Sequence, residues 1–346
     1  MDIKKILKYG SVIIITILLA FAIKIYIEIF TDNTNFKQEE VYVYIPTDSN
    51  YEQVKEIIAP FVKNIDNFES IAQKRNYPQN VKAGKFLFKK GMSSFALLSA
   101  IRRNVPVRLA FNNQERLENF VQRISSQIEP DSTKLVTSFR DSTFLKQNGF
   151  TSDNVFGMFL PNTYEVYWNI SAEKFRDKMI KEYHIFWTAA RLAKAEKLGL
   201  TPIQVITLAS IVHKETVKAD ERPRVAKVYL NRLELGMPLQ ADPTVIYAVK
   251  ARDNDFNQII KRVLYGDLTI NSPYNTYVNL GLPPGPIAMP DINAIDAVLN
   301  PENNNYIYFC ASVEKFGYHE FATTLAQHAV NRKKYVEWLN KQGTNR

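Results

Sequence analysis

The sequence has 346 residues, of which 46% are hydrophobic, and 44 Lys plus Arg residues against 35 Asp plus Glu residues give a formal net charge of +9. This length and hydrophobic content exclude an intrinsically disordered chain and are typical of about two folded domains. The positive charge suits contact with an anionic lipid surface or an acidic polymer. Zinc-finger spacing, a ribonucleoprotein aromatic motif and a long basic block are all absent from the sequence, so we expect no nucleic-acid partner.

The N-terminal segment has the pattern of a membrane anchor. Lys4, Lys5 and Lys8 precede an apolar stretch, and we predict a cytoplasmic N-terminus over 1–8 and a single transmembrane helix over 9–30. The positive-inside rule then places everything after residue 31 outside the cytoplasmic (inner) membrane, in a periplasmic or extracytoplasmic space. A cleaved signal peptide is the alternative, because the tripeptide Ala20-Phe-Ala22 resembles a small-residue cleavage site after a short apolar core. Because the apolar character continues beyond it, we favour the anchor.

Strand and helix patterns alternate after a polar linker over 31–40. Apolar residues at every second position predict a strand, and Ser49 with Glu52 predicts a capping box for the helix that follows. A second strand and helix complete a small α/β module over 41–104. Residues 105–155 are predicted to be a connecting region of short elements and turns.

A larger α+β domain is predicted over 156–346, so the fold class of the whole chain is α+β. We expect it to contain one long helix from about Ser171 to Leu198 and a later helix from about Arg222 to Leu235 that ends at Gly236. Cys310 is the single cysteine, which excludes an internal disulfide. Its apolar neighbours predict a buried strand residue.

Between these two helices, the sequence predicts a helix that ends in a carboxylate. Thr201 has the character of an N-cap, with Pro202 at the first helical position and Gln204 three residues after the cap. Glu215 ends the apolar side that includes Leu208, so we expect it to be partly removed from water. Such burial raises the pKa of a carboxyl group and suits it to general acid/base catalysis. The alternative is an ordinary ion pair with a nearby Lys or Arg, of which Lys214 and Lys218 are the nearest lysines.

Groups that bind sugars follow Gly236. Tyr274 and Tyr277 are able to stack on sugar rings, and Asp242, Thr244 and Asn275 are able to hydrogen-bond to hydroxyl groups, although each also fits a turn or core position. The prolines of 281–287 predict a stiff loop that forms either a binding wall or a purely structural element.

Seven segments together resemble the endolytic murein transglycosylase, or YceG-like, family. They are Ala209-Ser-Ile-Val212, Lys214-Glu-Thr216, Tyr229-Leu-Asn-Arg232, Gly236-Met237, Asp242-Pro-Thr-Val-Ile-Tyr247, Ser272-Pro-Tyr-Asn-Thr-Tyr277 and Gly281-Leu-Pro-Pro-Gly-Pro-Ile287. The resemblance is strong over about 155–335. It implies that Glu215 is the catalytic glutamate, that peptidoglycan glycan strands are the substrate and that cell-wall synthases are partners. It also implies that the small module is LysM-like.

The predicted substrate-binding set combines those polar residues with others from the same motifs. Its members are Asn231, Gln240, Asp242, Thr244, Tyr274, Asn275, Tyr277, Thr163 and Tyr164. One motif departs from the family pattern, because Phe156 and Asn162 replace two acids in Phe156-Gly-Met-Phe-Leu-Pro-Asn-Thr-Tyr164. Any role of those two acids is therefore in doubt here, whereas the assignment of Glu215 is unaffected.

The implied reaction requires one carboxylate. A lytic transglycosylase cleaves the MurNAc–GlcNAc bond without water and leaves a 1,6-anhydro sugar. A muramidase-type hydrolase needs a second carboxylate. Asp242 is the first candidate for this second carboxylate, and Asp220 and Glu221 are further candidates. A non-catalytic glycan-binding scaffold is the third possibility.

No metal or cofactor is expected. His213 lies near Glu215, but the second His that a zincin motif requires is missing from the sequence. Cleavage of an acetal by acid and base needs no metal. His319 and His328 flank the start of the last predicted helix. We interpret both as surface or capping residues, with contact to the substrate as the alternative.

Overall fold

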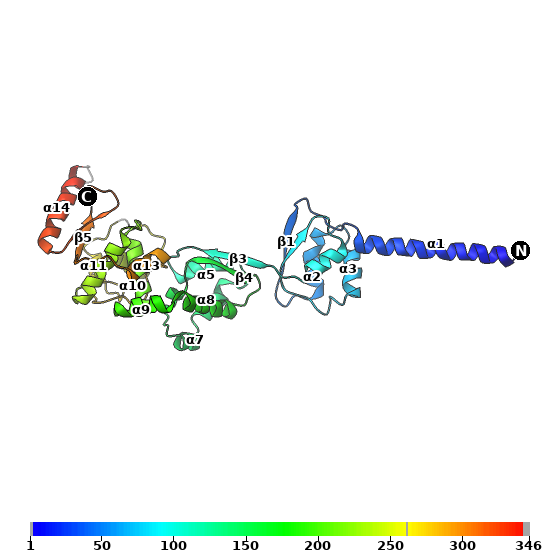
Figure 1. Ribbon diagram of the computed structural model, residues 1–346, viewed down its shortest axis with the longest axis horizontal. Coiled ribbons are helices and arrows are strands. Elements are labelled where there is room, and N and C mark those ends of the chain that lie inside the picture. The colour runs from blue at the N-terminus through cyan, green and yellow to red at the C-terminus, as the bar shows by residue number, and fades with distance from the viewer. Residues whose placement is uncertain (1–2, 261, 342–346) are drawn as a thin grey trace. The chain divides into compact units, whose positions relative to one another are not determined.

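The protein is described by a computed structural model over residues 3–260 and 262–341. It is a mixed α+β chain, as predicted, and it divides into two compact units (Figure 1). Unit 1 consists of Met1–Leu109, Gln127–Pro130 and Tyr164–Ser171, and unit 2 of Ala110–Ser126, Asp131–Thr163 and Ala172–Arg346. The predicted segments 1–8 and 156–346 include residues outside the described ranges.

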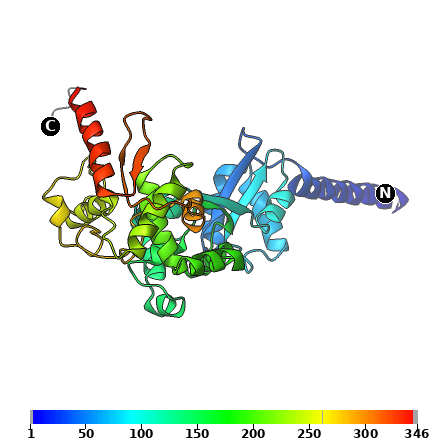
Figure 2. The same ribbon diagram turned by 60° about the vertical axis from the view of Figure 1, so that its left-hand side comes forward.

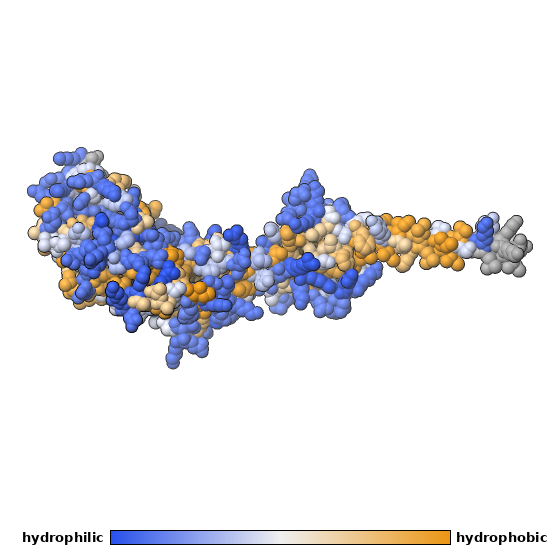
Figure 3. Space-filling model, in the orientation of Figure 1, coloured by the Kyte–Doolittle hydropathy of each residue, from blue (hydrophilic) through white to orange (hydrophobic). Residues whose placement is uncertain are grey.

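Unit 1 begins with the apolar helix α1 (Ile3–Phe30). Its stretch Lys8–Ile27 is long and apolar enough to cross a membrane, and none of it is buried. Figure 3 shows hydrophobic residues over the middle and C-terminal part of this helix. Because an apolar surface this large is unstable in water, α1 is a candidate membrane span.

The core of unit 1 lies between one small sheet and three helices. The antiparallel strands β1 (Glu40–Ile45) and β2 (Gly84–Lys89) pair with Val43 opposite Phe86. Helices α2 (Tyr51–Ile58), α3 (Ile65–Lys74) and α4 (Ser94–Ala100), with the short 3-10 helix η1 (Ala59–Phe61), complete the module. Both Val43 and Phe86 belong to its hydrophobic core.

The predicted cap of α2 is wrong by one residue. Asn50 is the N-cap, and it forms the capping box with Gln53. Ser49 is part of the preceding turn, where its hydroxyl donates a hydrogen bond to the Pro46 carbonyl and Asp48 adopts a positive φ of 64°. The helix therefore begins after that turn, at Tyr51.

Two paired strands run from one unit into the other. They are β3 (Pro106–Phe111) and β4 (Asn162–Tyr167). In unit 2, the first group of helices packs around Phe120, Phe139 and Phe159, whose ring centroids lie 4.4–6.1 Å apart. These elements are α5 (Leu117–Ser125), α6 (Ser132–Phe139), α7 (Ser142–Gln147), the 3-10 helix η2 (Val155–Met158) and α8 (Ala172–Phe186).

The long helix predicted from Ser171 to Leu198 is in fact two helices. After α8, the chain leaves the helical conformation at Thr188, and α9 (Ala189–Lys197) begins. The Thr188 hydroxyl accepts a hydrogen bond from the Arg191 amide. This is an N-cap contact, and it lies inside the segment that we predicted to be one continuous helix. Trp187 is buried at this break, so tertiary packing overrides the continuous helical pattern.

Helix α10 (Pro202–Glu215) is the central element of unit 2. Eight consecutive residues from Val205 to Val212 are buried. This helix contacts α11 (Arg222–Glu234), α12 (Asp242–Arg252) and α13 (Ile292–Leu299). We predicted one apolar face, and the structure shows burial around the whole circumference because neighbouring helices cover the other faces.

The C-terminal part of unit 2 is a hairpin with a helix packed against it. Strands β5 (Tyr308–Ala311) and β6 (His319–Ala322) are antiparallel, and α14 (Leu325–Lys341) lies beside them (Figure 2). The ring of His328 on α14 stacks on Tyr308 at 5.2 Å, so His328 is not the surface or capping residue that we predicted.

Candidate active site

Local sequence signals fix the start of α10, the helix that carries Glu215 at its other end. Thr201 and Gln204 form the predicted capping box, and Pro202 is at the first helical position. Glu215 is the last residue of the helix, and the amide of Thr216 closes the turn by donating to the Val212 carbonyl. Since the preceding turns are buried, the position of the Glu215 carboxylate is set by the core of unit 2.

Glu215 has a neutral hydrogen-bond partner on α11. The Tyr229 hydroxyl donates a hydrogen bond of 2.5 Å to Oε1 of Glu215. Tyr229 is only 1% exposed, and its ring contacts Phe309 on β5 at 5.9 Å. Burial raises the pKa of Glu215 to about 7, and the Tyr229 hydrogen bond partly opposes this rise. The prediction of a partly desolvated carboxylate is confirmed.

The ion-pair alternative for Glu215 is not supported. Lys214 binds Glu115 at 2.5 Å, and Lys218 lies over the ring of Tyr318 at 5.2 Å. Within residues 3–260 and 262–341, Glu215 has no ion pair within 4.0 Å. A carboxyl group that is partly desolvated and has no ion pair is able to hold and release a proton near neutral pH.

A second carboxylate lies in the same electrostatic environment. Asp242 is the first residue of α12, and its Oδ1 accepts a 2.6 Å hydrogen bond from the Tyr277 hydroxyl. The charge of Asp242 contributes to the raised pKa of Glu215. The structure therefore brings together Glu215, Asp242 and Tyr277, although they come from different parts of the sequence.

A His–Glu pair beside Glu215 was not predicted. His319 on β6 donates its backbone N–H to Glu221 at 2.8 Å, and its Nδ1 lies 2.9 Å from the other carboxylate oxygen. The Glu221 side chain is fully buried. Burial would raise its pKa, but the hydrogen bonds from His319 outweigh this and lower it. The charge of His319 opposes the rise in the pKa of Glu215.

The prediction that His319 is a surface or capping residue is therefore wrong. It is a strand residue, and its partner lies 98 positions earlier in the sequence. No local pattern indicates a contact over that separation. The other proposed second carboxylate, Asp220, accepts two hydrogen bonds of 3.1 Å from the Tyr318 hydroxyl.

Three predicted binding residues have side chains that are bound within the protein. Asn231 donates to the carbonyls of Asn304 and Tyr306. Asn275 donates to those of Leu268 and Ile270, and Thr244 donates to that of Ala241. Thr244 and Asn275 are completely buried and Asn231 nearly so. These side chains hold the backbone around the site and do not face a ligand.

The remaining predicted residues differ in exposure. Gln240 is exposed and has a positive φ of 50°. The ring of Tyr274 packs on Tyr247 at 4.6 Å, which leaves it partly exposed. Thr163 is exposed in a separate shallow hollow of unit 2, together with Asp291. Tyr164 is buried and belongs to unit 1.

The two departures from the family motif occupy different environments. Phe156 is buried in η2, so an apolar side chain suits its position. Asn162 is exposed, and its side-chain oxygen accepts a hydrogen bond from the Thr163 amide. Neither residue lies on an element that carries Glu215, Asp242 or His319.

The proline-rich loop after Gly281 packs against the core. The Ile287 amide donates a 3.0 Å hydrogen bond to the hydroxyl of Ser210, which is fully buried on α10. A Cβ atom on Gly285 would collide with the Asp153 carbonyl. This loop therefore supports α10 and is, at least in part, structural.

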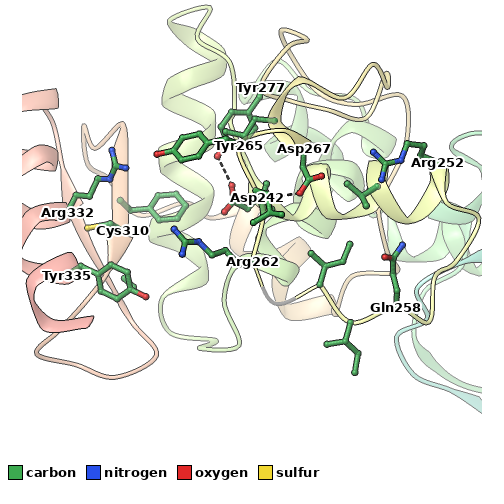
Figure 4. A pocket seen from close by; sticks show the side chains of 18 of the residues that line it. Asp242, Arg252, Gln258, Arg262, Tyr265, Asp267, Tyr277, Cys310, Arg332 and Tyr335 are labelled. Carbon is green, nitrogen blue, oxygen red and sulfur yellow. Dashed lines mark hydrogen bonds between the residues drawn. The ribbon is translucent and has the colours of Figure 1, made fainter. Parts of the chain in front are cut away.

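A groove of about 1210 Å³ opens beside Asp242 and Tyr277. One side consists of α12 and the loop that contains the short 3-10 helix η3 (Asp267–Thr269), and the other side consists of β5 and α14 (Figure 4). Cys310 is a strand residue as predicted, but it is half-buried and lines this groove.

The site contains no obvious metal ligands. Among the described residues, no group of three His, Cys, Asp or Glu side chains is arranged to hold a metal ion. His213 instead lies 3.3 Å from Asp291 and 3.2 Å from Arg222. Its pKa is lowered, chiefly by burial.

Comparison with known proteins shows the family of this chain. Residues 43–334 match the YceG-like family. The chain belongs to this family. The endolytic murein transglycosylase of Bacillus subtilis strain 168 is 29% identical over 279 residues, which cover 75% of this chain and 74% of the relative. The resemblance seen in the sequence motifs is thereby confirmed.

Two further similarities extend over most of the chain. The endolytic murein transglycosylase of Streptococcus pneumoniae strain R6 is 26% identical over 331 residues, which cover 86% of this chain but 58% of that protein. This chain therefore spans less than two thirds of the pneumococcal relative. The crystal structure of a YceG-like protein from Listeria monocytogenes matches with a TM-score of 0.56 and 27% identity, covering 85% of this chain and 99% of that one.

Proposed function

We propose that the protein is an endolytic peptidoglycan lytic transglycosylase in which Glu215 acts first as acid and then as base. The observation that carries this proposal is the half-buried Glu215 carboxyl group, which has no ion pair among the described residues and whose pKa desolvation raises to about 7. The names of the B. subtilis and S. pneumoniae relatives support the same reaction.

The reaction has two steps and uses one carboxyl group. Protonated Glu215 gives its proton to the oxygen that joins MurNAc C1 to GlcNAc, and the C1–O bond breaks. Ionised Glu215 then takes the proton from the MurNAc C6 hydroxyl while that oxygen bonds to C1. The products are a strand ending in 1,6-anhydroMurNAc and a strand with a free GlcNAc hydroxyl, and Glu215 is protonated again.

Neighbouring residues tune and position this group. The hydrogen bond from Tyr229 stabilises ionised Glu215 in the second step. Asp242 and Tyr277 offer a carboxylate and a phenol to sugar hydroxyls at the mouth of the groove. Glu221 holds the imidazole ring of His319 in place through the ring's Nδ1 atom. The other ring nitrogen, Nε2, does not take part in this contact.

A muramidase-type hydrolase is the second candidate. The exposed carboxylate of Asp242, whose charge acts on Glu215, favours it because hydrolysis needs a second carboxylate as nucleophile or as base. A non-catalytic glycan-binding scaffold is the third candidate. The raised pKa of Glu215 favours a catalytic role over that scaffold.

Other parts of the chain have proposed roles consistent with this reaction. We propose that α1 anchors the protein with its N-terminus in the cytoplasm, and that the catalytic domain over 156–346 acts outside. The module over 41–104, which has two antiparallel strands with helices between them, supports a LysM-like assignment. Cell-wall synthases are the proposed partners.

Mass spectrometry of the products tests the proposal. The full-length protein in detergent is incubated with uncrosslinked glycan strands beside Glu215→Gln and the exposed control Glu234→Gln. We expect anhydroMurNAc ends from the wild type and the control, and a loss of about 10²–10⁴-fold for Glu215→Gln. Reducing MurNAc ends would indicate the hydrolase, whereas no cleavage by the folded wild type would indicate the scaffold.

A further inference from the structure

The groove beside Asp242 and Tyr277 has a second cluster of polar groups, away from Glu215. Arg262 lies in the loop before η3, and Arg332 lies on α14. Both line the same groove, and so do the phenols of Tyr265 and Tyr335. Figure 4 shows Arg262 directed toward the strand side of the groove, where Arg332 and Cys310 lie.

These two arginines differ from the other arginines nearby. Nε of Arg252 is bound to Asp253 at 2.7 Å, and the guanidinium of Arg232 is bound to the carbonyls of Leu239 and Ile307. Within the described part of the chain, neither Arg262 nor Arg332 has an ion pair within 4.0 Å, and both are exposed. The groove therefore presents two guanidinium groups with unused hydrogen-bond donors.

The carboxylates of the groove do not neutralise these two groups. Asp253 is occupied by Arg252, and Asp242 accepts the Tyr277 hydroxyl. Asp267 accepts a 2.9 Å hydrogen bond from the Leu264 amide. The acids thus lie on the α12 side, where each carboxylate already accepts a hydrogen bond or pairs with Arg252, and the β5 and α14 side contributes the cation Arg332 together with His328.

We propose that Arg262 and Arg332 bind the free carboxylates of the peptide branch carried by a sugar held at Asp242 and Tyr277. Guanidinium groups bind carboxylates through paired, charge-assisted hydrogen bonds, and two such groups suit a peptide with more than one carboxylate. The inference rests on the proposed function, because it assigns this part of the groove to the peptide of a peptidoglycan strand.

The test crosses two substrates with two variants. One set of strands keeps its peptides, and the other is stripped by an amidase that cuts the bond between the lactyl group and the peptide. The double variant R262Q/R332Q is compared with wild type and with the control R252Q, which changes an arginine already bound to Asp253 in the same groove. The measured quantity is kcat/KM for release of anhydroMurNAc ends.

We expect R262Q/R332Q to lose about 10-fold or more on peptide-bearing strands, because each lost charge-assisted contact weakens binding by roughly that order. On stripped strands it should equal the wild type, and R252Q should resemble the wild type on both substrates. An equal loss on both substrates would overturn the proposal, and so would no loss on either.

Binding measurements separate this proposal from the proposed reaction. Calorimetry with a soluble muramyl peptide needs no turnover, and Glu215→Gln should bind it as the wild type does. R262Q/R332Q should bind it about 10-fold more weakly, and a peptide with amidated carboxylates should bind weakly to every variant. If wild type cleaves no strand yet shows this binding pattern, the reaction fails and the carboxylate subsite stands. Unchanged binding by R262Q/R332Q overturns the subsite.

Discussion

At the scale of single residues, Glu215 combines a fixed position with a pKa near neutrality. The helix around it is buried, and its hydrogen-bond donor is the phenol of Tyr229 and not a cation. A cation in that place would lower the pKa and keep the carboxyl group ionised. A neutral partner therefore leaves Glu215 able to act as the acid that the first step of the proposed reaction requires.

Tyr229→Phe should move the pH profile in a defined direction. The hydrogen bond from Tyr229 lowers the pKa of Glu215, so its removal should raise that pKa above about 7. In the proposed reaction protonated Glu215 acts first, so kcat/KM should fall as pH rises through this pKa. The falling limb should move upward by about one pH unit. Tyr42→Phe in unit 1 is the control. A falling limb that stays in place or moves downward would contradict this role for Tyr229.

The sequence predicted the helix that ends at Glu215 well because its signals are local. A cap, a proline and an apolar pattern lie within one helix, and each acts through neighbouring residues. His319 was mispredicted because its partner Glu221 is distant in sequence and joins it only when β6 packs near α11. Asn231, Thr244 and Asn275 looked like sugar-binding residues because residue type alone does not distinguish an amide or hydroxyl that faces a ligand from one that binds the backbone.

At the scale of elements, the ends of α10 and α11 were predictable, whereas the break between α8 and α9 was not. The α11 boundary at Gly236 agrees with its positive φ of 64°. The break at Thr188 lies within a polar and apolar pattern that continues on both sides, so only the packing of Trp187 reveals it. Helix α12 also went unrecognised, since its first residues Asp242 and Pro243 resemble a turn.

The proline-rich loop supports α10, and Gly285→Ala should show this. A Cβ atom at Gly285 would meet the carbonyl of Asp153, so we expect the free energy of unfolding to fall by at least about 2 kcal/mol. Urea denaturation at pH 7 measures this change. Gly266→Ala is the matched control, because a Cβ there has open space and its φ is −64°. A Gly285→Ala protein as stable as the control would show that the loop adapts easily.

At the scale of the whole molecule, the sequence predicts the candidate membrane span most clearly, since a 20-residue stretch of high mean hydropathy carries the signal without help from tertiary contacts. The division into units is less accessible to prediction. Unit 1 takes two short segments, Gln127–Pro130 and Tyr164–Ser171, from beyond the continuous part of its chain. No change in amino-acid composition marks the points at which the chain returns to unit 1.

Cysteine labelling in cells tests the proposed orientation. Cys310 is the single cysteine, so Cys310→Ser gives a background without thiols. In that background, Phe316→Cys introduces a thiol at a position that is 89% exposed. A membrane-impermeant maleimide should label it in intact spheroplasts, and should label Lys8→Cys only after permeabilisation. The reverse pattern would invert the orientation, and recovery of the protein without its N-terminus in the soluble fraction would indicate a signal peptide.

The interleaving of the two units has a consequence for biosynthesis. The chain passes between units after Leu109, Ser126, Pro130, Thr163 and Ser171. A ribosome delivers residues in order, so the last segment of unit 1 emerges after two segments of unit 2 have already appeared. Neither unit is completed before the chain reaches Ser171, and a protease that cuts once between Leu109 and Ser171 would leave each product without part of its own fold.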